Sequence, residues 1–206
     1  MIAKELDLAI LPEPKVLNIP GLTYIPNYIN EQEQNQLLNC VDQQPWAIDS
    51  EELTRRIQQH GYKLIYQKGV LVASCYLGAL PDWLGEMARR FVADGLTPTV
   101  PEQVTINEYL PGQGIRSHID CDTCFGNTVL TLSAGSSCVM QFTHIHTKEK
   151  AEILLLPGSL LILKGAARYH WLHGVAPRKA DIYQGKEFMR ARRVSLAFRE
   201  VLFPHK

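Results

Sequence analysis

Apolar residues recur at helical spacing in two segments of the first half of the chain. The first segment follows Asn30, where Glu33 stands three residues further on in the pattern of a capping box, and its apolar positions continue to Val41. The second segment covers residues 81–92, in which large apolar side chains fall on one helical face. The pattern therefore predicts two amphipathic helices.

From residue 104 onward, short apolar runs alternate with turn residues such as Pro157-Gly158. Many short strands at such spacing are typical of a β-sandwich or barrel. We therefore expect one α+β, mainly β domain over residues 1–206, in which N-terminal helices support a β core. The predicted strands are residues 104–110, 114–119, 129–133, 138–142, 151–156, 159–163, 171–175 and 193–201.

The composition is that of a folded domain of ordinary size. The chain has 206 residues, 46% of them hydrophobic, so disorder is not expected. Lysine plus arginine number 21 and aspartate plus glutamate also number 21, which gives a net charge of zero. Composition alone therefore does not indicate a nucleic-acid-binding protein, and any basic surface must be local.

The cysteine pattern and the absence of long apolar runs bear on the compartment. The five cysteines are odd in number and show no disulfide framework, which fits a reducing setting. Cys121 and Cys124 have the spacing of half a zinc site, but no second pair completes it, so we interpret them as structural or incidental. Residues 1–15 lack the pattern of a secretory signal, and no apolar run approaches the roughly 20 residues of a membrane span. We expect a cytoplasmic monomer without membrane contact.

His118 and Asp120 are the first candidates for chemistry. Residues i and i+2 of a strand point to the same face, so an imidazole and a carboxylate can lie side by side. A distant histidine, for which His173 is the candidate, would complete a facial triad with open positions on iron(II). The sequence His118-Ile119-Asp120 is a weak signal by itself, and other histidines compete as ligands. These are His60, His144, His146 and His170.

The segment from Arg193 to Arg199 is the second candidate. Period two places Arg193, Ser195 and Arg199 on one face and apolar residues on the other. Guanidinium groups suit carboxylates, so the polar face is a candidate site for a dicarboxylate. The arginines lie about 20 Å apart along a straight strand, so one of them is expected to play a supporting role. An edge strand with its arginines in solvent is the alternative.

Two further groups of polar residues complete the set. Asn107 and Tyr109 share a strand face and offer an amide and a phenol for hydrogen bonding, just ahead of the strand with His118. A basic and aromatic segment between residues 53 and 66 is expected to form a nucleotide-facing lid, since arginines hold phosphates and tyrosines stack on bases. A polar strand pair packed on the core is the alternative. The expected lid residues are Arg55, Arg56, His60, Tyr62 and Tyr66.

The order of these motifs resembles the AlkB family. Asn107-Glu108-Tyr109, Pro111 to Ile115, His118 to Asp120, His173-Gly174 and Arg193 to Arg199 follow one another as in that family. The resemblance implies a double-stranded β-helix core, with residues 1–103 as a helical layer and lid and residues 104–206 as the catalytic part. It also implies iron(II), 2-oxoglutarate and dioxygen as cofactor and cosubstrates.

The resemblance also implies roles for single residues. It implies that His118, Asp120 and His173 bind iron, and that Asn107, Tyr109, Arg193 and Arg199 bind 2-oxoglutarate. Many members have asparagine where this chain has Ser195, so the expected contact there differs.

The expected substrate is a modified base in DNA or RNA. AlkB repair enzymes carry a second acid two residues after the ligand aspartate, and Asp122 matches it. A carboxylate there would attract the cationic bases 1-methyladenine and 3-methylcytosine, which indicates oxidative demethylation. The motif around residues 168–174 looks most like the homologues that hydroxylate a transfer-RNA wobble uridine, a neutral base, so that reaction is an alternative. A protein side-chain hydroxylase and a non-enzymatic cupin-like binding module also remain open.

Overall fold

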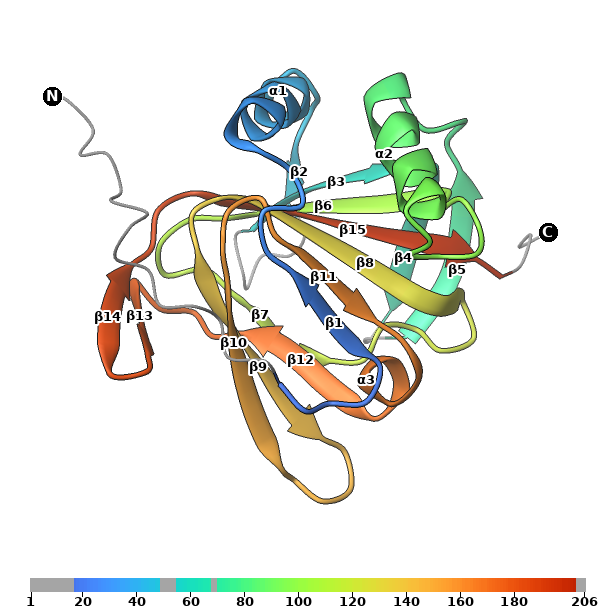
Figure 1. Cartoon of the computed structure of the whole chain (residues 1–206). Helices are drawn as coiled ribbons and strands as arrows, with labels where there is room; N and C mark the ends of the chain where they lie inside the picture. The colour runs from blue at the N-terminus through green and yellow to red at the C-terminus, as the bar shows by residue number, and fades with distance from the viewer. Residues whose placement is uncertain (1–16, 49–54, 68–69, 203–206) are drawn as a thin grey trace, which may run out of the picture.

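The chain forms two antiparallel sheets that face each other, with two helices above the larger sheet (Figure 1). The computed structural model describes residues 17–48, 55–67 and 70–202, without the side chains of residues 66–67 and 70–74. The mainly β architecture is therefore as predicted. The seven-stranded sheet has the order β1 (Leu22–Ile25), β11 (Leu160–Leu163), β8 (Phe125–Gly135), β15 (Arg193–Val201), β6 (Gln103–Tyr109), β3 (Arg56–His60) and β2 (Ala47–Ile48).

The smaller sheet closes the other side of the sandwich. Its order is β10 (Lys150–Leu155), β9 (Cys138–His144), β12 (Trp171–Val175) and β7 (Ile115–His118). Apolar side chains of both sheets, such as Leu161 from β11 and Phe142 from β9, pack in one buried cluster between them. Two hairpins lie outside this sandwich, β4 (Tyr62–Gln67) with β5 (Val70–Tyr76) and β13 (Ala180–Tyr183) with β14 (Lys186–Met189).

Both predicted helices are present and cover the outer face of the larger sheet (Figure 1). Helix α1 (Glu31–Asp42) starts with the predicted capping box: the Asn30 side chain accepts from the Glu33 amide at 2.9 Å, and the Glu33 carboxylate accepts from the Asn30 amide at 2.8 Å. Helix α2 (Asp82–Ala93) buries Phe91 against Phe198 of β15, with ring centroids 5.0 Å apart. These contacts bury the apolar face that the spacing predicts.

Strand β15 separates its two kinds of side chain as predicted. Val194, Leu196 and Phe198 belong to the core beneath the helices, and each is fully buried. Arg193 and Arg199 point to the other side, into the space between the sheets. The alternative of an exposed edge strand is wrong, because β15 lies between β8 and β6 in the middle of the sheet.

The description of residues 1–103 as a helical layer is incomplete. This segment also supplies strands β1 to β5, of which β1 pairs with β11 and β3 pairs with β6. The hairpin β13–β14 and the short helix α3 (Gly165–Tyr169) were likewise not among the predicted elements. Elements of four or five residues are too short for periodicity to identify, and their partners come from distant parts of the chain.

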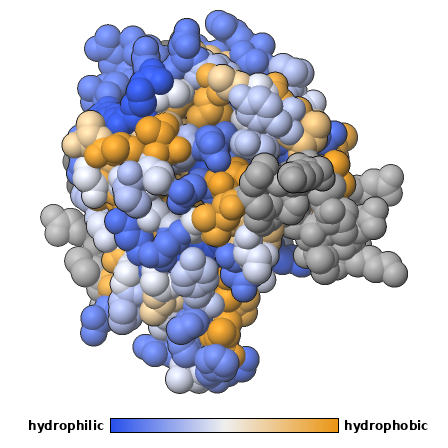
Figure 2. Space-filling model, turned by 90° about the vertical axis from the view of Figure 1, so that its right-hand side faces the viewer, coloured by the Kyte–Doolittle hydropathy of each residue, from blue (hydrophilic) through white to orange (hydrophobic). Residues whose placement is uncertain are grey.

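The surface over α2, β4 and β5 is mixed in character. Figure 2 shows separate apolar patches between polar side chains on this side of the molecule. Tyr76 and Leu77, at the end of β5, are among the large apolar residues that remain exposed. Within the described residues, neither the length nor the hydropathy of any helix suffices to cross a membrane.

Candidate metal and cosubstrate site

His118, Asp120 and His173 come together between the sheets, as the sequence predicts. Strands β7 and β12 pair in antiparallel fashion with His118 opposite His173, and their ring centroids lie 4.6 Å apart. Each residue offers one ligand atom, and these atoms all lie within 4.8 Å of one another. A Cβ at Gly174 would lie 2.8 Å from the Ser117 backbone nitrogen, so the glycine after His173 permits this close pairing.

A backbone contact fixes the orientation of the His118 ring. Its Nδ1 atom lies 2.8 Å from the Arg116 carbonyl oxygen, which can only accept, so Nδ1 donates. The Nε2 atom lies 3.7 Å from the Asp120 carboxylate and is directed toward the other two candidate ligands. A backbone acceptor on the far nitrogen is the usual arrangement for a metal-binding histidine.

His173 is present in the form that binds a metal. Burial lowers its pKa to about 4, so the ring is neutral at physiological pH. Its Nδ1 atom is buried and has no hydrogen-bond partner in the part of the chain that the structure describes. A buried ring nitrogen without a partner is costly, and a neutral imidazole fits a divalent transition metal such as iron(II).

Asp120 stays ionised because a buried arginine lies beside it. Arg199 approaches both carboxylate oxygens, with Nη2 to Oδ1 at 3.1 Å and Nε to Oδ2 at 3.4 Å. Burial by itself would raise the pKa of Asp120, but the charge of Arg199 and the contact with His118 lower it well below its usual range. Arg199 therefore acts here on the candidate metal ligand, which is the supporting role expected for one of the two arginines.

Arg168 is a residue of the site to which the sequence alone assigned no role. Its side chain is 1% exposed and donates to the carbonyl oxygens of Asp120 and Cys121, at 2.8 Å each. It thus holds the chain where the strand with His118 ends and Asp120 follows. Its place five residues before His173 was a hint, but its burial depends on contacts with a distant segment.

Arg193 lies in a second polar group, deeper between the sheets. The register of β15 with β6 sets Arg193 opposite Tyr109 and Ser195 opposite Asn107. The guanidinium carbon lies 5.4 Å from the Tyr109 ring centroid, and Nη2 donates to the Ser133 hydroxyl at 2.8 Å. The register confirms that these predicted residues gather, and it adds Ser133 of β8 to them.

The charge of Arg193 is not neutralised by an acid. The side chain is 2% exposed, it forms no ion pair within the described residues, and its Nε atom has no hydrogen-bond partner there. A buried guanidinium without an anion is unfavourable, and it suits a bound carboxylate. The geometry therefore provides a carboxylate site on the face of β15 that also carries Arg199, the partner of the candidate ligand Asp120.

The segment between residues 53 and 66 divides between two locations. Arg55 is buried, donates to the Gly114 carbonyl at 3.3 Å and lies 5.6 Å from the Tyr109 ring centroid, next to the Arg193 site. Arg56 and His60 lie on the helix side of the sheet, where Arg56 pairs with Glu108 and His60 packs against Trp83. Alternation along β3 turns these two side chains away from the metal ligands, so the structure does not bring them together with the other expected lid residues.

The remaining lid residues lie on the β4–β5 hairpin. Tyr62 packs against Tyr76 of the neighbouring strand, with ring centroids 5.1 Å apart. Leu64 is buried against Cys124 and Phe125, which places the hairpin beside the turn that follows Asp120. The side chain of Tyr66 lies outside the described residues. The segment therefore forms a strand pair, as in the alternative to a lid, and this pair borders the site.

The turn after Asp120 contains the candidate Asp122 and a disulfide bond. Asp122 is exposed in this turn. Cys121 and Cys124 are joined, whereas Cys40, Cys75 and Cys138 are free. The expectation of no disulfide is wrong for this pair, because the turn brings the two Cα atoms to 5.3 Å. The structural interpretation of the two cysteines fits this bond.

The competing histidines lie elsewhere. His144 packs against His146 and His170, with ring centroids 5.9 Å and 6.3 Å apart, at the end of the β9–β10 hairpin. The Nδ1 atom of His144 accepts from the Thr147 amide at 3.1 Å. Only His118, Asp120 and His173 form a possible metal-binding group within the described residues.

Comparisons with known proteins agree with this geometry. The family model of the 2OG-Fe(II) oxygenase superfamily matches residues 21–199. The Danio rerio protein named "Probable RNA/DNA demethylase ALKBH6" is 31% identical, covering 88% of this chain and 86% of that protein. The structure of OsALKBH1 has a TM-score of 0.65 at 16% identity and covers 90% of this chain and 100% of that one.

A longer relative matches only in part. The Xenopus tropicalis protein named "tRNA (carboxymethyluridine(34)-5-O)-methyltransferase alkbh8" is 35% identical over 82% of this chain. The chain spans 27% of the length of that relative.

The fold, the three candidate ligands and the family match define a 2OG-Fe(II) oxygenase with a double-stranded β-helix core. Within that superfamily the chain belongs to the AlkB family. It is therefore a dioxygenase, an oxidoreductase that uses iron(II), 2-oxoglutarate and dioxygen.

Proposed function

We propose that the protein oxidatively demethylates N-alkylated bases in DNA or RNA, with 1-methyladenine and 3-methylcytosine as substrates. The observation that carries the proposal is that one face of β15 carries both Arg199, which holds Asp120 of the candidate metal-binding group, and Arg193, which is buried and forms no ion pair within the described residues. The similarity to a protein named a probable RNA/DNA demethylase, over most of both chains, supports a nucleic-acid substrate.

His118, Asp120 and His173 would hold the iron, which supplies the coupling of dioxygen reduction to oxidative decarboxylation of 2-oxoglutarate. Arg193 would bind a carboxylate of 2-oxoglutarate through charge-assisted hydrogen bonds, with Tyr109 and Asn107 beside it. Ser195 lies opposite Asn107 and lines the same side of the sheet. The surrounding burial excludes water and strengthens these contacts.

Arg199 and Arg168 would position the metal ligands. Arg199 holds the Asp120 carboxylate, and Arg168 holds the backbone carbonyls of Asp120 and Cys121. We therefore assign Arg199 to Asp120 first and to the cosubstrate second. Residues 104–206 supply the proposed metal and 2-oxoglutarate ligands, and residues 1–103 supply helices α1 and α2 and the β4–β5 hairpin.

The β4–β5 hairpin would contact the base or its flanking nucleotides. Tyr62 and Tyr76 offer adjoining aromatic rings, of which Tyr76 is 62% exposed. Tyr66 continues the same strand, and Arg55 reaches the carboxylate site rather than the surface. Stacking on aromatic rings tolerates any base, so this contact would support binding rather than the choice of lesion.

Hydroxylation of a modified wobble uridine in transfer RNA is the second candidate. The similarity to the Xenopus ALKBH8 protein favours it, as does the exposed position of Asp122. A uridine derivative is neutral and has no need of a carboxylate at this position.

Asp122→Asn distinguishes the two reactions. Demethylation of a cationic base would be slowed, because the substitution removes the attraction and keeps the shape, while uncoupled 2-oxoglutarate consumption continues. Mass spectrometry of oligonucleotides with 1-methyladenine, 3-methylcytosine or a modified uridine, together with released formaldehyde, measures this. If Asp122→Asn processed both cationic bases as fast as the wild type, Asp122 would be a turn residue and the uridine reaction would be favoured.

We also propose that the protein works as a monomer in the cytoplasm. Cys75 is a free and exposed thiol, which fits a reducing compartment. Size-exclusion chromatography with light scattering would give the mass in solution, and a dimer would contradict the proposal.

A further inference from the structure

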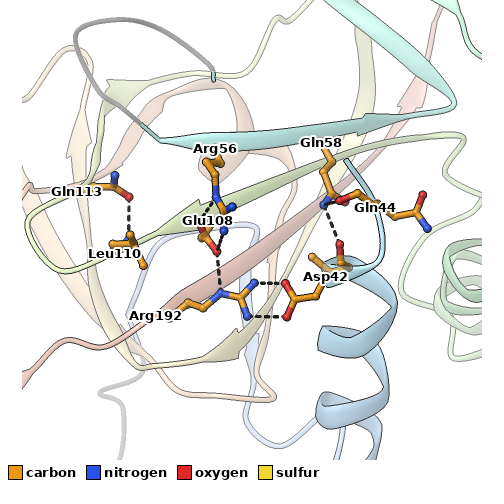
Figure 3. A network of polar contacts seen from close by, with 9 residues as sticks. Asp42, Gln44, Arg56, Gln58, Glu108, Leu110, Gln113 and Arg192 are labelled. Carbon is orange, nitrogen blue, oxygen red and sulfur yellow. Dashed lines mark hydrogen bonds and ion pairs between the residues drawn. The ribbon is translucent and has the colours of Figure 1, made fainter. Parts of the chain in front are cut away.

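A chain of charged side chains crosses the helix side of the larger sheet directly behind the carboxylate site (Figure 3). Glu108 of β6 accepts from Arg56 of β3 at 2.6 and 2.7 Å, which is bidentate geometry. The same carboxylate accepts from Arg192 Nε at 2.7 Å, and the other end of Arg192 holds Asp42 of helix α1. We name this group of four residues the Glu108 network.

Glu108 is the buried centre of this network. Its side chain is 2% exposed, while those of Arg56, Arg192 and Asp42 are 47%, 34% and 47% exposed. Burial by itself would raise the pKa of Glu108, but the hydrogen bonds and charges of the two arginines lower it below its usual range. The carboxylate therefore stays ionised and retains both cations.

The network members adjoin the proposed cosubstrate residues in the chain. Glu108 lies between Asn107 and Tyr109, and Arg192 immediately precedes Arg193. Neighbouring residues of a strand point to opposite faces, so Glu108 points toward the helices while its neighbours point between the sheets. Glu108 and Arg192 are thus each joined by a single peptide bond to a residue of the carboxylate site.

The network joins the strands that must keep their relative positions. It links β3, β6 and the start of β15, which carry Arg55, Tyr109 and Arg193. Both guanidinium groups lie over the Tyr109 ring, at 5.6 Å and 5.4 Å. A small rotation of β6 or of the start of β15 would change these distances, because the side chains move with the backbone.

We propose that Glu108 is a positioning residue for 2-oxoglutarate, which sets the placement of Tyr109 and Arg193 through its ion pairs with Arg56 and Arg192. This inference rests on the proposed function, since it requires the carboxylate site to bind 2-oxoglutarate. Glu108 itself does not touch the cosubstrate, because it lies on the other face of the sheet.

Glu108→Gln tests this assignment because it keeps the shape and removes the charge. The dissociation constant for 2-oxoglutarate is measured by calorimetry on the iron(II)-loaded protein under anaerobic conditions, so the result does not depend on turnover. We expect the constant to rise about tenfold, since misplacement of a binding group by a fraction of an ångström is costly. The affinity for manganese(II) should not change, because the metal ligands lie on other strands.

Glu33→Gln is the matched control. Glu33 forms an ion pair with Arg90 at 2.7 Å in the same helix layer, and glutamine can still accept from the Asn30 amide in the capping box. It removes one carboxylate from the helix side without touching β6 or β15. A similar rise of the dissociation constant in Glu108→Gln and Glu33→Gln would mean that the effect is one of general stability, and it would overturn the proposal.

Two further variants keep the test valid if Glu108→Gln does not fold. Arg56→Gln removes one cation from a half-exposed position and should raise the dissociation constant several-fold. Arg193→Lys keeps the charge but loses the bidentate geometry of the guanidinium group. Adding Glu108→Gln to this variant should therefore raise the dissociation constant by a smaller factor than it does in the wild type. Additive effects would show that Glu108 does not act through Arg193.

The outcomes separate this inference from the proposed function. Absence of 2-oxoglutarate binding to the wild-type protein would contradict the proposed function itself. Normal binding by the wild type together with unchanged binding by Glu108→Gln and Arg56→Gln would overturn only the role of Glu108.

Discussion

The two faces of the seven-stranded sheet use charged residues in opposite ways. On the helix side, Glu108 has two arginine partners, and a large apolar core lies between the sheet and the helices. On the side facing the smaller sheet, and among the residues that the structure describes, Arg193 is buried without an acid and His173 has a buried ring nitrogen without a partner. Satisfied charges indicate a structural face, and buried polar groups without partners indicate where a ligand binds.

The largest expected effect comes from the candidate metal ligands. His118→Ala, Asp120→Ala and His173→Ala should each abolish turnover while the fold survives, because the three ligands act as a unit. Circular dichroism checks the fold, and an anaerobic manganese(II) titration checks the metal. Turnover at the wild-type rate in any of the three variants would contradict the assignment.

Substitution of the two arginines of β15 should affect different binding steps. Arg193→Ala should raise the dissociation constant for 2-oxoglutarate about 100-fold, since it removes charge-assisted hydrogen bonds to a buried carboxylate. Arg199→Ala should also weaken metal binding, because Arg199 bonds to Asp120. Oligonucleotide affinity, measured by fluorescence anisotropy, should stay nearly unchanged in both. Loss of that affinity with normal 2-oxoglutarate binding would mean that this face contacts nucleic acid.

On the helix side, a core substitution should affect stability rather than chemistry. Phe198→Ala removes a fully buried ring that packs on Phe91, and it should lower the free energy of unfolding by about 3–5 kcal/mol. Urea unfolding measures this. The fraction that remains folded should keep its affinity for 2-oxoglutarate. A large loss of affinity in that fraction would show that the apolar core, and not only the Glu108 network, determines the geometry of the carboxylate site.

The charge of Glu108 should make its stabilising effect depend on pH. Its pKa is lowered in the folded protein, so the stabilisation is complete above the usual glutamate range and is lost as the pH falls. Near neutral pH, Glu108→Gln should lower the free energy of unfolding by about 2 kcal/mol. The difference from the wild type should shrink on acidification. A difference that does not vary with pH would show that shape, and not charge, is responsible.

The catalytic half was easier to predict than the segment before it. Strand β15 combines period two with an arginine at each end, so its faces followed from the sequence alone. Strand β3 has the same alternation, yet it did not indicate that Arg56 and His60, which were expected in a lid, lie on the helix side. Its neighbours are mostly polar on both sides, so alternation could not show which face packs under the helices.

The role of Arg199 was also beyond the sequence. Spacing along the strand indicated that one arginine would be supporting, but not which. Asp120 comes from a different sheet, and only the packing of the sheets brings its carboxylate to 3.1 Å from Arg199. Arg168 is similar, because its partners are backbone carbonyls, whose positions no side-chain pattern records.

The sequence by itself determined the two long helices, the faces of β15 and the chemistry of the candidate ligands, because all of these depend on local order. The capping box, the alternation of β15 and the spacing of His118 and Asp120 each involve residues within a few positions of one another. The tertiary structure alone decided which charges are paired. Burial and ion pairing depend on strands that are distant in the chain, so only the folded sheets separate the satisfied Glu108 from the acid-free Arg193.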